Sequence, residues 1–372
     1  MSGAPLRCLH VASGDGWGGA EVSATHLILE LSRRPDVDVQ VVLLNDGAMG
    51  QRLRDAGVRT HLLAEREHSF LALSRQFDRL VDEADPQILH SHRYKEHLLC
   101  ARSAHRRRLF HLRSAHGRAP ELRLGRRLHG VGPLFDRLVA LWLGAHWLAV
   151  SSDLASEVGG VRQRVDVVPN GIPAEGPAAD RATLAEALGR PLEDCWVVGY
   201  VGRFEPVKRP DRMLRLFERL PQQLAGKRVV GCMLGDGPLW ESTATAVGSL
   251  GLNQRLVLTG RRDDAESLLG ALDLLIIPSD HEGHPMVLLE AMRASVPVVA
   301  SRVGGLVEAL GETPWLVPAG NDTAMVDAVK SMLENSDARR DWSAELRQRF
   351  ERSGTIQASA DQVLKIYRGE IA

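Results

Sequence analysis

Four charged residues, two basic and two acidic, are candidates for chemistry because they follow predicted strands. Arg203 and Lys208 follow the apolar run WVVGYV and stand five positions apart. Glu282 follows the run DLLIIP, and Glu290 lies further on, among the apolar residues of MVLLEAM. Two cations at the carboxyl end of a strand suit a diphosphate, because arginine grips two oxygens and lysine acts as a point charge. The alternative interpretation of Arg203 and Lys208 is ordinary surface charge.

The segment after Glu282 predicts the start of a helix at Pro285, since proline is favoured at the first helical position. The N–H groups of Met286 and Val287 would then be available to a phosphate or a sugar hydroxyl. Favourable contact with the helix dipole is a sufficient alternative explanation for Glu282. It does not explain Glu290, which either faces solvent or accepts hydrogen bonds from a pair of hydroxyls.

Glycine-rich turns follow two further predicted strands. The segment GDGWGGAE, at positions 14–21, satisfies the dinucleotide pattern G-x-G-x-x-G, which is weak when it stands alone. The segment LGDGP contains Gly235, which either lets the backbone approach a ligand or makes a tight turn, and Pro238 is expected to start a helix.

Histidines follow two predicted strands of the first half. His92 or His116 would hydrogen-bond a sugar or carry a proton, and His116 is the better candidate because it lies between a strand end and Gly117. No histidine pair stands beside a carboxylate in an HExxH pattern, so no bound metal is expected.

Composition favours an ordinary globular protein. The 372 residues are 44% hydrophobic and 25% charged, with a net charge of −1, which gives no overall argument for nucleic acid or a membrane as a partner. Four scattered cysteines indicate neither disulfides nor a zinc site. Without an apparent signal peptide or membrane-spanning run, we expect a cytoplasmic location, at most peripheral to the inner face of the plasma membrane.

One local stretch is strongly basic. Residues 102–127 contain nine arginines and a single acid, Glu121. The stretch is either a solvated helical face or a patch for an anionic partner, such as a phosphorylated acceptor or an acidic membrane.

Short apolar runs alternate with amphipathic stretches along most of the chain, which predicts an α/β protein with parallel sheets. The length favours two domains, and the Gly-, Pro- and Ala-rich segment 170–195 is the expected break. We therefore predict two doubly wound, Rossmann-like domains at 1–172 and 190–352, with a C-terminal helix in 353–372 that crosses back. Loops after the strands would line a cleft between the domains.

Taken together, these segments resemble retaining glycosyltransferases of the GT-B fold, specifically glycosyltransferase family 4. Glu282 and Glu290 reproduce the E-x(7)-E signature of that family within EGHPMVLLEAM. Its other landmarks are matched in order by GGAE, LRSAHG, VVPNGI, VGRFEPVK, LGDGP and VGGLVE. The resemblance implies transfer of a sugar from a nucleotide-diphosphate sugar, with retained anomeric configuration. It also implies that neither a metal nor a cofactor is bound, and UDP is among the candidate nucleotides.

The resemblance also implies roles for single residues. Arg203 and Lys208 would neutralise the departing diphosphate, and Glu290 would accept hydrogen bonds from the ribose. Glu282 and His116 would contact the donor sugar. The remaining substrate-binding positions are Gly18, Gly19, Gly235, Gly283, His284, Pro285, Met286 and Val287.

The resemblance places the basic stretch in the acceptor-binding half. We therefore expect an anionic, lipid-linked acceptor of the envelope polysaccharide or lipopolysaccharide type. Two departures from the family pattern are His284, where an aromatic residue is common, and Ser295, where glycine is common.

Three alternatives stay open at this point. An NAD(P)-dependent oxidoreductase would use the opening glycines with Asp46 as its acid. A nucleotide-sugar 2-epimerase of the same fold would form product without an acceptor. A sugar-nucleotide-binding regulator would not need the pair of cations.

Overall fold

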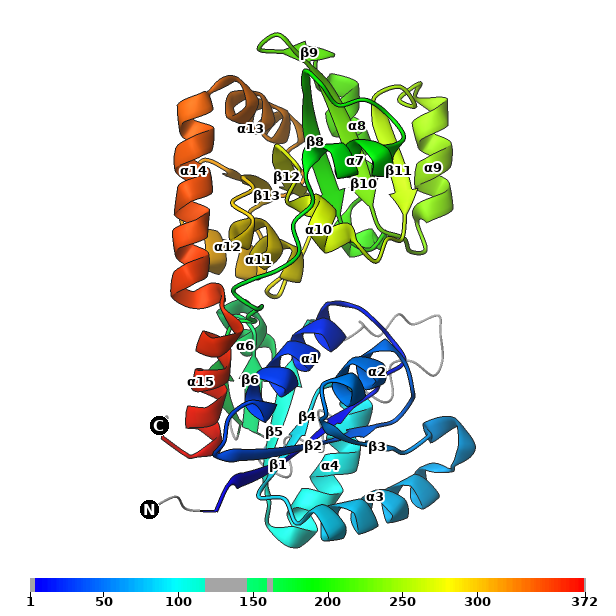
Figure 1. Cartoon of the computed structure of the whole chain (residues 1–372), viewed down its shortest axis with the longest axis vertical. Helices are drawn as coiled ribbons and strands as arrows, with labels where there is room; N and C mark the ends of the chain where they lie inside the picture. Colours follow the sequence, from blue (N-terminus) through cyan, green and yellow to red (C-terminus); the bar gives the residue numbers. More distant parts are fainter. Residues whose placement is uncertain (1–3, 118–145, 159–162, 371–372) are drawn as a thin grey trace. The chain divides into compact units, whose positions relative to one another are not determined.

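The computed structural model describes residues 4–117, 146–158 and 163–370, which form two compact units. The first unit joins residues 1–172 to 356–372, and the second is the continuous segment 173–355 (Figure 1). The arginines of the basic stretch from Arg118 onward lie outside the described residues.

The first unit is a parallel sheet of seven strands in the order β3-β2-β1-β4-β5-β6-β7. Its strands are β1 Leu6–Ala12, β2 Val37–Leu43, β3 Arg59–Leu62, β4 Ile88–Ser91, β5 Phe110–Ala115, β6 His146–Ala149 and β7 Arg164–Val167. Its described helices are α1 Gly19–Ser32, α2 Ala48–Asp55, the short 3₁₀ turn Glu65–Glu67, α3 Phe70–Ala84, α4 Tyr94–Arg107, α6 Ser152–Val158 and α15 Ile356–Tyr367.

The second unit has a sheet in the order β11-β10-β8-β12-β13-β14, parallel throughout, with β9 antiparallel to β10. Its strands are β8 Cys195–Val201, β9 Gln223–Leu224, β10 Lys227–Leu234, β11 Leu256–Gly260, β12 Leu274–Ile277, β13 Val298–Ser301 and β14 Leu316–Val317. Its helices are α7 Arg181–Leu188, the 3₁₀ turn Pro206–Lys208, α8 Asp211–Arg219, α9 Trp240–Ser249, α10 Ala265–Leu269, α11 Met286–Arg293, α12 Gly304–Leu310, α13 Asp322–Glu334, α14 Ser336–Arg349 and the π-helical turn Phe350–Gly354.

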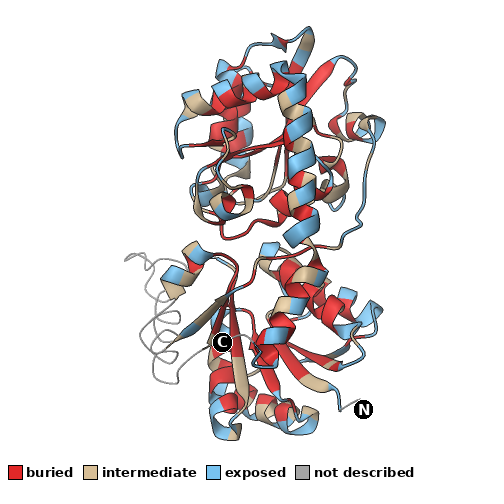
Figure 2. Ribbon diagram, turned by 90° about the vertical axis from the view of Figure 1, so that its left-hand side faces the viewer, coloured by how far each residue is buried: buried red, intermediate tan, exposed pale blue. Residues whose placement is uncertain are grey.

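The central strands of each sheet are buried on both faces, which explains why they are almost continuous apolar runs (Figure 2). In the first unit, alternate residues of β1 enter two different cores. Cys8 and Ala12 pack with α1, α2 and α15, whereas Leu9 and Val11 pack with α3 and α4. The prediction of an α/β fold with two Rossmann-like sheets is confirmed.

In each sheet, the order in which successive strands are added changes direction at one point, called the switch point. The chain moves to opposite sides of β1 and β4 in the first sheet, and of β8 and β12 in the second. In open α/β sheets, ligands bind at the carboxyl ends of the strands at such a switch point. The loops that follow these four strands are therefore the expected ligand-binding loops.

Several predicted boundaries differ from the structure. The edge strand β3 was not predicted, because its residues are half-exposed and form no apolar run. The segment 170–195 contains the helix α7, which Asp180 caps by accepting a hydrogen bond from the Thr183 N–H. Pro238 lies before α9, whose N-cap is Leu239. The prediction that Pro238 starts that helix is therefore wrong by two residues, since α9 begins at Trp240.

Candidate active site

The loops after β8 and β12 bring Lys208 and Glu282 together. The Lys208 ammonium donates to the Glu282 carboxylate, with 2.6 Å between Nζ and Oε2. The second carboxylate oxygen accepts from the Ser279 hydroxyl at 2.6 Å. Glu282 is buried, whereas Lys208 keeps 31% of its side chain exposed. The pair thus forms at the switch point of the second sheet, with the cation on the accessible side.

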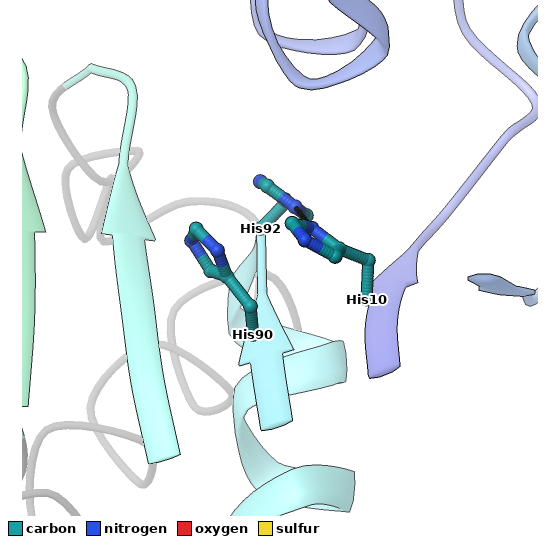
Figure 3. Close-up of side chains that lie close together, drawn as sticks. All are labelled: His10, His90 and His92. Carbon is teal, nitrogen blue, oxygen red and sulfur yellow. Dashed lines mark hydrogen bonds between the residues drawn. The ribbon is translucent and has the colours of Figure 1, made fainter. Parts of the chain in front are cut away.

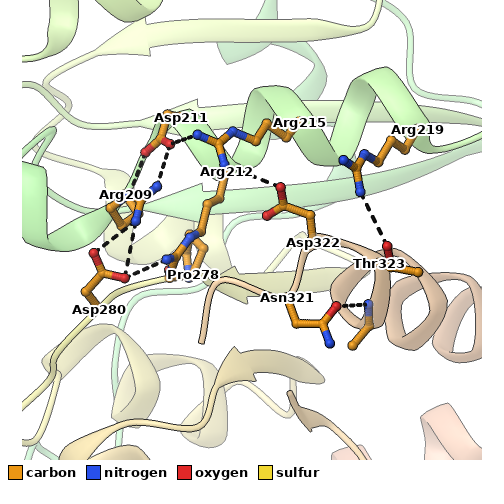
Figure 4. A network of polar contacts seen from close by, with 11 residues as sticks. Arg209, Asp211, Arg212, Arg215, Arg219, Pro278, Asp280, Asn321, Asp322 and Thr323 are labelled. Atoms are coloured by element: carbon orange, nitrogen blue, oxygen red, sulfur yellow. Dashed lines mark hydrogen bonds and ion pairs between the residues drawn. The ribbon is translucent and has the colours of Figure 1, made fainter. Parts of the chain in front are cut away.

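A network of ion pairs holds these two loops against each other (Figure 4). Asp280, two positions before Glu282, accepts from Arg209 at 3.0 Å and from Arg212 at 2.6 Å. The buried Arg212 also donates to the Pro278 carbonyl at 2.6 Å, and the Asp280 N–H donates to the Val207 carbonyl at 2.8 Å. Because both loops are tied on either side of the Lys208–Glu282 pair, its geometry is preorganised.

Arg203 has a more open position than Lys208. Its guanidinium is paired with Glu205 at 2.7 Å, and 55% of its side chain is exposed. Its carbonyl accepts from the Tyr200 hydroxyl at 2.7 Å, which fixes the backbone while the guanidinium remains at the surface. The two cations predicted for a diphosphate therefore occur in one loop but in different environments.

Gly235 has a packing reason for being glycine. Its φ is +137°, and a Cβ added there would lie 2.0 Å from the carbonyl oxygen of Gly202. The close approach in this turn is thus to the backbone of the β8 loop. The substrate-binding role of Gly235 stays a prediction.

The helix α11 begins at Met286, with Pro285 as its N-cap, one position later than predicted. The N–H groups of Met286 and Val287 are still in the first turn, where an α-helix offers no internal acceptor. Gly283 and His284 are buried in the loop before the helix. Burial lowers the pKa of His284 to about 4, against the opposing effect of Glu308.

Glu290 is half-buried on α11, and its carboxylate has no ion pair among the described residues. Burial raises its pKa to about 7; the charge of Glu266 adds to this effect, and Arg293 opposes it. Arg293 itself pairs with Glu266 at 2.7 Å. A half-buried acid without a partner is an arrangement that a ligand with paired hydroxyls would satisfy.

The glycine turn after β1 is built around Glu21. Gly18 is the N-cap of α1, which begins at Gly19, and the Gly18 N–H donates to Glu21 Oε2 at 3.1 Å. The other oxygen of Glu21 pairs with Arg93, from the loop after β4. A diphosphate at this turn would therefore have to displace Glu21 from the Gly18 N–H, whereas Gly19 lies in the first helical turn. Both glycines stay predictions.

His116 follows β5 and contacts His92, the other histidine singled out from the sequence. His116 Nε2 lies 3.3 Å from His92 Nδ1. Burial and the nearby charge of Arg93 lower the pKa of His116 to about 4, so the ring is neutral near pH 7. His116 Nδ1 is buried and has no hydrogen-bond partner among the described residues.

Ion pairs and burial reduce the net positive charge that the described part of the basic stretch presents at the surface. Arg102, Arg106 and Arg107 all pair with Asp78 on α3, at 3.2, 3.0 and 2.9 Å. Arg113 is buried in β5, with 1% of its surface exposed, so including it in a surface patch is wrong. Among the described residues, no helix is both long and apolar enough to cross a membrane.

Sequence reasoning missed several polar residues near the candidate site. Ser279 and Asp280 belong to the same loop as Glu282 and could have been identified from the loop's polar composition. His10 and Tyr367 lie next to the contact between His92 and His116, but the apolar runs around them predicted only a strand and a helix. Asp46, required by the oxidoreductase hypothesis, is instead paired with Arg54 at 2.9 Å.

Two family matches cover most of the chain. Residues 17–175 match the family described as Glycosyltransferase Family 4, and residues 184–349 match Glycosyl transferases group 1. A 2-deoxystreptamine glucosyltransferase of Streptomyces kanamyceticus is 34% identical over 189 residues, 49% of this chain and 48% of the relative. A D-inositol 3-phosphate glycosyltransferase of Corynebacterium glutamicum (strain R) is 32% identical over 188 residues, 47% of this chain and 45% of the relative. The matches thus span about half the length of these curated relatives.

Solved structures share the fold over almost the whole chain. Anabaena HepE in complex with UDP-glucose has a TM-score of 0.82 at 19% identity, covering 97% of this chain and 99% of that one. The lipopolysaccharide outer core galactosyltransferase WaaB, in its apo form, has a TM-score of 0.70 at 18% identity and covers 98% of this chain and 100% of that one.

Proposed function

Because the chain belongs to glycosyltransferase family 4, we propose that it transfers a sugar from a nucleotide-diphosphate sugar to an acceptor hydroxyl with retention of anomeric configuration. The observation that carries the proposal is the contact between Lys208 and Glu282 at the switch point of the second sheet. UDP is the first nucleotide to test, since the HepE structures of the same fold hold UDP and UDP-glucose.

Lys208 and Arg203 would stabilise the charge that develops on the diphosphate as the glycosidic bond breaks. Cations that meet this charge in the transition state lower the barrier, beyond what they contribute to binding. They would take the place of a divalent ion, so the proposed reaction is independent of metal. Glu282, held by Ser279 and Lys208, would accept from a sugar hydroxyl, and Glu290 from the ribose.

No side chain is needed as a base in this proposal. The departing phosphate oxygen would take the proton of the acceptor hydroxyl, so the proton moves from one oxygen to the other as the new bond forms. His116 would contact the donor sugar as a neutral ring, consistent with its lowered pKa of about 4.

We propose an acceptor from the cell envelope, either a glycan or a glycolipid, with a negatively charged group. The outer-core transferase WaaB shares the fold, which supports testing this class. The names of the curated relatives add 2-deoxystreptamine and D-inositol 3-phosphate to the panel. Contact of residues 102–127 with an anionic membrane is tested by sedimentation with phosphatidylglycerol vesicles.

The experiment begins with a thermal-shift screen of sugar nucleotides and continues with an assay of nucleotide release. Release should occur slowly without an acceptor, rise with the correct acceptor and persist in EDTA, while NMR of the product should show the anomeric configuration of the donor. Stabilisation by NAD(P)H with no response to any sugar nucleotide would contradict the proposal. Conversion of the donor sugar to its 2-epimer would favour the epimerase.

A further inference from the structure

A row of polar side chains lies inside the core of the first unit. Parallel pairing places His10 on β1 opposite His90 on β4 (Figure 3). Alternate residues of a strand share a face, so these residues point toward the side of the sheet that α1 and α15 cover. We call the row the buried polar chain, and its members are Ser114, His90, Tyr367, His10, His92 and His116.

Hydrogen bonds connect the buried polar chain from end to end. Ser114 Oγ lies 2.7 Å from His90 Nε2, and His90 Nδ1 lies 2.6 Å from the Tyr367 hydroxyl. That hydroxyl lies 3.2 Å from His10 Nε2, and His10 Nδ1 lies 3.1 Å from His92 Nε2. The contact at 3.3 Å between His92 Nδ1 and His116 Nε2 then completes the chain.

The rings of His10, His90 and His92 also lie near enough to suggest a metal, with one nitrogen of each within 4.8 Å of the others. Each ring, however, already has a hydrogen-bond partner on both nitrogens. A metal would have to break at least one of these bonds for every ring that it coordinated. The observed contacts therefore favour a hydrogen-bonded chain.

The histidines of the chain are neutral near pH 7. Burial lowers the pKa of His10 to about 3, and burial with the neighbouring rings holds the pKa values of His90 and His92 well below the usual range. A neutral imidazole carries one N–H and one acceptor nitrogen. Each ring must therefore accept at one end and donate at the other, so all bonds of the chain run in one direction.

The two ends decide that direction. If His116 donated toward Ser114, the Ser114 hydroxyl would have a buried hydrogen without an acceptor, because among the described residues Oγ contacts only His90 and the residue is 2% exposed. If Ser114 donates toward His116, the only donor left over is the N–H on His116 Nδ1. This atom lies at the carboxyl end of β5, on the ligand-binding edge of the sheet. Donation toward Ser114 would leave two buried groups unsatisfied, the Ser114 hydrogen and the acceptor nitrogen His116 Nδ1, whereas donation toward His116 leaves one, so the second direction is favoured.

We propose that Tyr367, His10 and His92 are positioning residues that hold His116 as the tautomer with its hydrogen on Nδ1. His116 then presents an N–H donor to an oxygen of the bound ligand. The identity of this ligand rests on the proposed function, whereas the tautomer does not. Under that function, the oxygen belongs to the donor sugar or its phosphate. A residue of α15 thus acts on the site through three side chains of the sheet.

The tautomer is measured directly by two-bond ¹H–¹⁵N correlation NMR on ¹⁵N-histidine-labelled full-length protein. The His116 signals are assigned by their loss in His116→Ala. The wild type is expected to show hydrogen on His116 Nδ1 at pH 7, and Tyr367→Phe to give a mixture of tautomers. Tyr94→Phe, at an exposed tyrosine outside the chain, serves as the matched control and should leave the His116 signals unchanged.

Kinetics test whether Tyr367 acts through His116. Tyr367→Phe is expected to lower kcat about tenfold, the effect of one impaired hydrogen bond, while KM for the sugar nucleotide stays within about twofold. In a His116→Ala background, the same substitution should have no further effect on kcat. If Tyr367→Phe does not fold, as judged by circular dichroism, Ser114→Ala interrupts the other end and should give the same mixture of tautomers.

Three results would overturn the inference. They are hydrogen on His116 Nε2 in the wild type, a loss of kcat in Tyr367→Phe that persists in the His116→Ala background, and stoichiometric zinc or copper in the purified protein that is released by substituting His10. Failure of the proposed function is distinguishable, because it would remove sugar transfer while leaving hydrogen on His116 Nδ1.

Discussion

Replacing Lys208 by methionine separates its effect on stability from its effect on the reaction. The substitution keeps an unbranched side chain of similar length and removes the ammonium that lies 2.6 Å from Glu282 Oε2. Ser279 would then be the remaining partner of a carboxylate that is 5% exposed. Breaking a fully buried ion pair costs about 3–5 kcal/mol, and the partial exposure of Lys208 reduces our expectation to about 1–3 kcal/mol.

The effect on turnover should be larger than the structural effect alone can explain. If Lys208 meets charge that develops on the diphosphate, kcat for donor hydrolysis and for transfer falls on the order of 100-fold, equivalent to about 2.7 kcal/mol. Glu282→Gln in the same chain removes the uncompensated charge. The double variant should therefore regain stability against urea but not turnover.

The assays are urea unfolding and nucleotide release at saturating donor. Lys365→Met, at an exposed lysine of α15, is the matched control and should change neither quantity. A Lys208→Met protein that folds and keeps kcat within about threefold of the wild type would refute the diphosphate assignment. Recovery of turnover in the double variant would show instead that Lys208 acts only by neutralising Glu282.

Further predictions concern the loops and helix of the second unit. KM for the donor should fall as pH rises through about 7 and Glu290 ionises, and Glu290→Gln should abolish this dependence; steady-state kinetics at constant ionic strength from pH 5.5 to 8.5 measure it. Since the folded pKa of Glu290 is raised, its contribution to stability should decline as pH rises from about 4.5 to about 7, a trend that urea unfolding should find absent in Glu290→Gln. Arg212→Ala should cost about 2–4 kcal/mol in urea unfolding, because it releases Asp280 and the Pro278 carbonyl, whereas Arg219→Ala, at an exposed residue of the same helix, should cost under about 0.5 kcal/mol. Gly235→Ala should cost at least about 2 kcal/mol by collision with the Gly202 carbonyl, and Gly189→Ala, with φ of +62° and open space around it, about 1 kcal/mol; equal costs in urea unfolding would contradict the packing argument.

The fold could be predicted from the sequence because both sheets are parallel and buried. Strands that are covered on two faces read as continuous apolar runs, as Leu6–Ala12 and Cys195–Val201 do. The edge strand Arg59–Leu62 has half-exposed faces and no such run, so the apolar pattern did not predict it. For helices, the existence of the element was easier to predict than its first residue. Pro285 indicated the start of α11, but it occupies the N-cap position and the helix begins at Met286.

Individual residues of the candidate site could be predicted where they directly follow a strand. The contacts between these residues could not, because tertiary packing determines them. Lys208 and Glu282 were singled out separately, and their contact required the strand order that places β8 beside β12. His92 and His116 were likewise recognised as strand-end residues. Their link to Tyr367 depends on α15 returning to the first sheet, which no local pattern shows.

The return of α15 makes the second unit an insertion within the first. Residues 173–355 are continuous in the chain, so the whole second unit is synthesised before α15. The N-terminal segment, by contrast, lacks the part of its core that Val363 and Leu364 supply until α15 has been made. N-terminal domains usually fold first during synthesis, but here that order should be reversed. The first unit can therefore complete its core only after α15 has been synthesised.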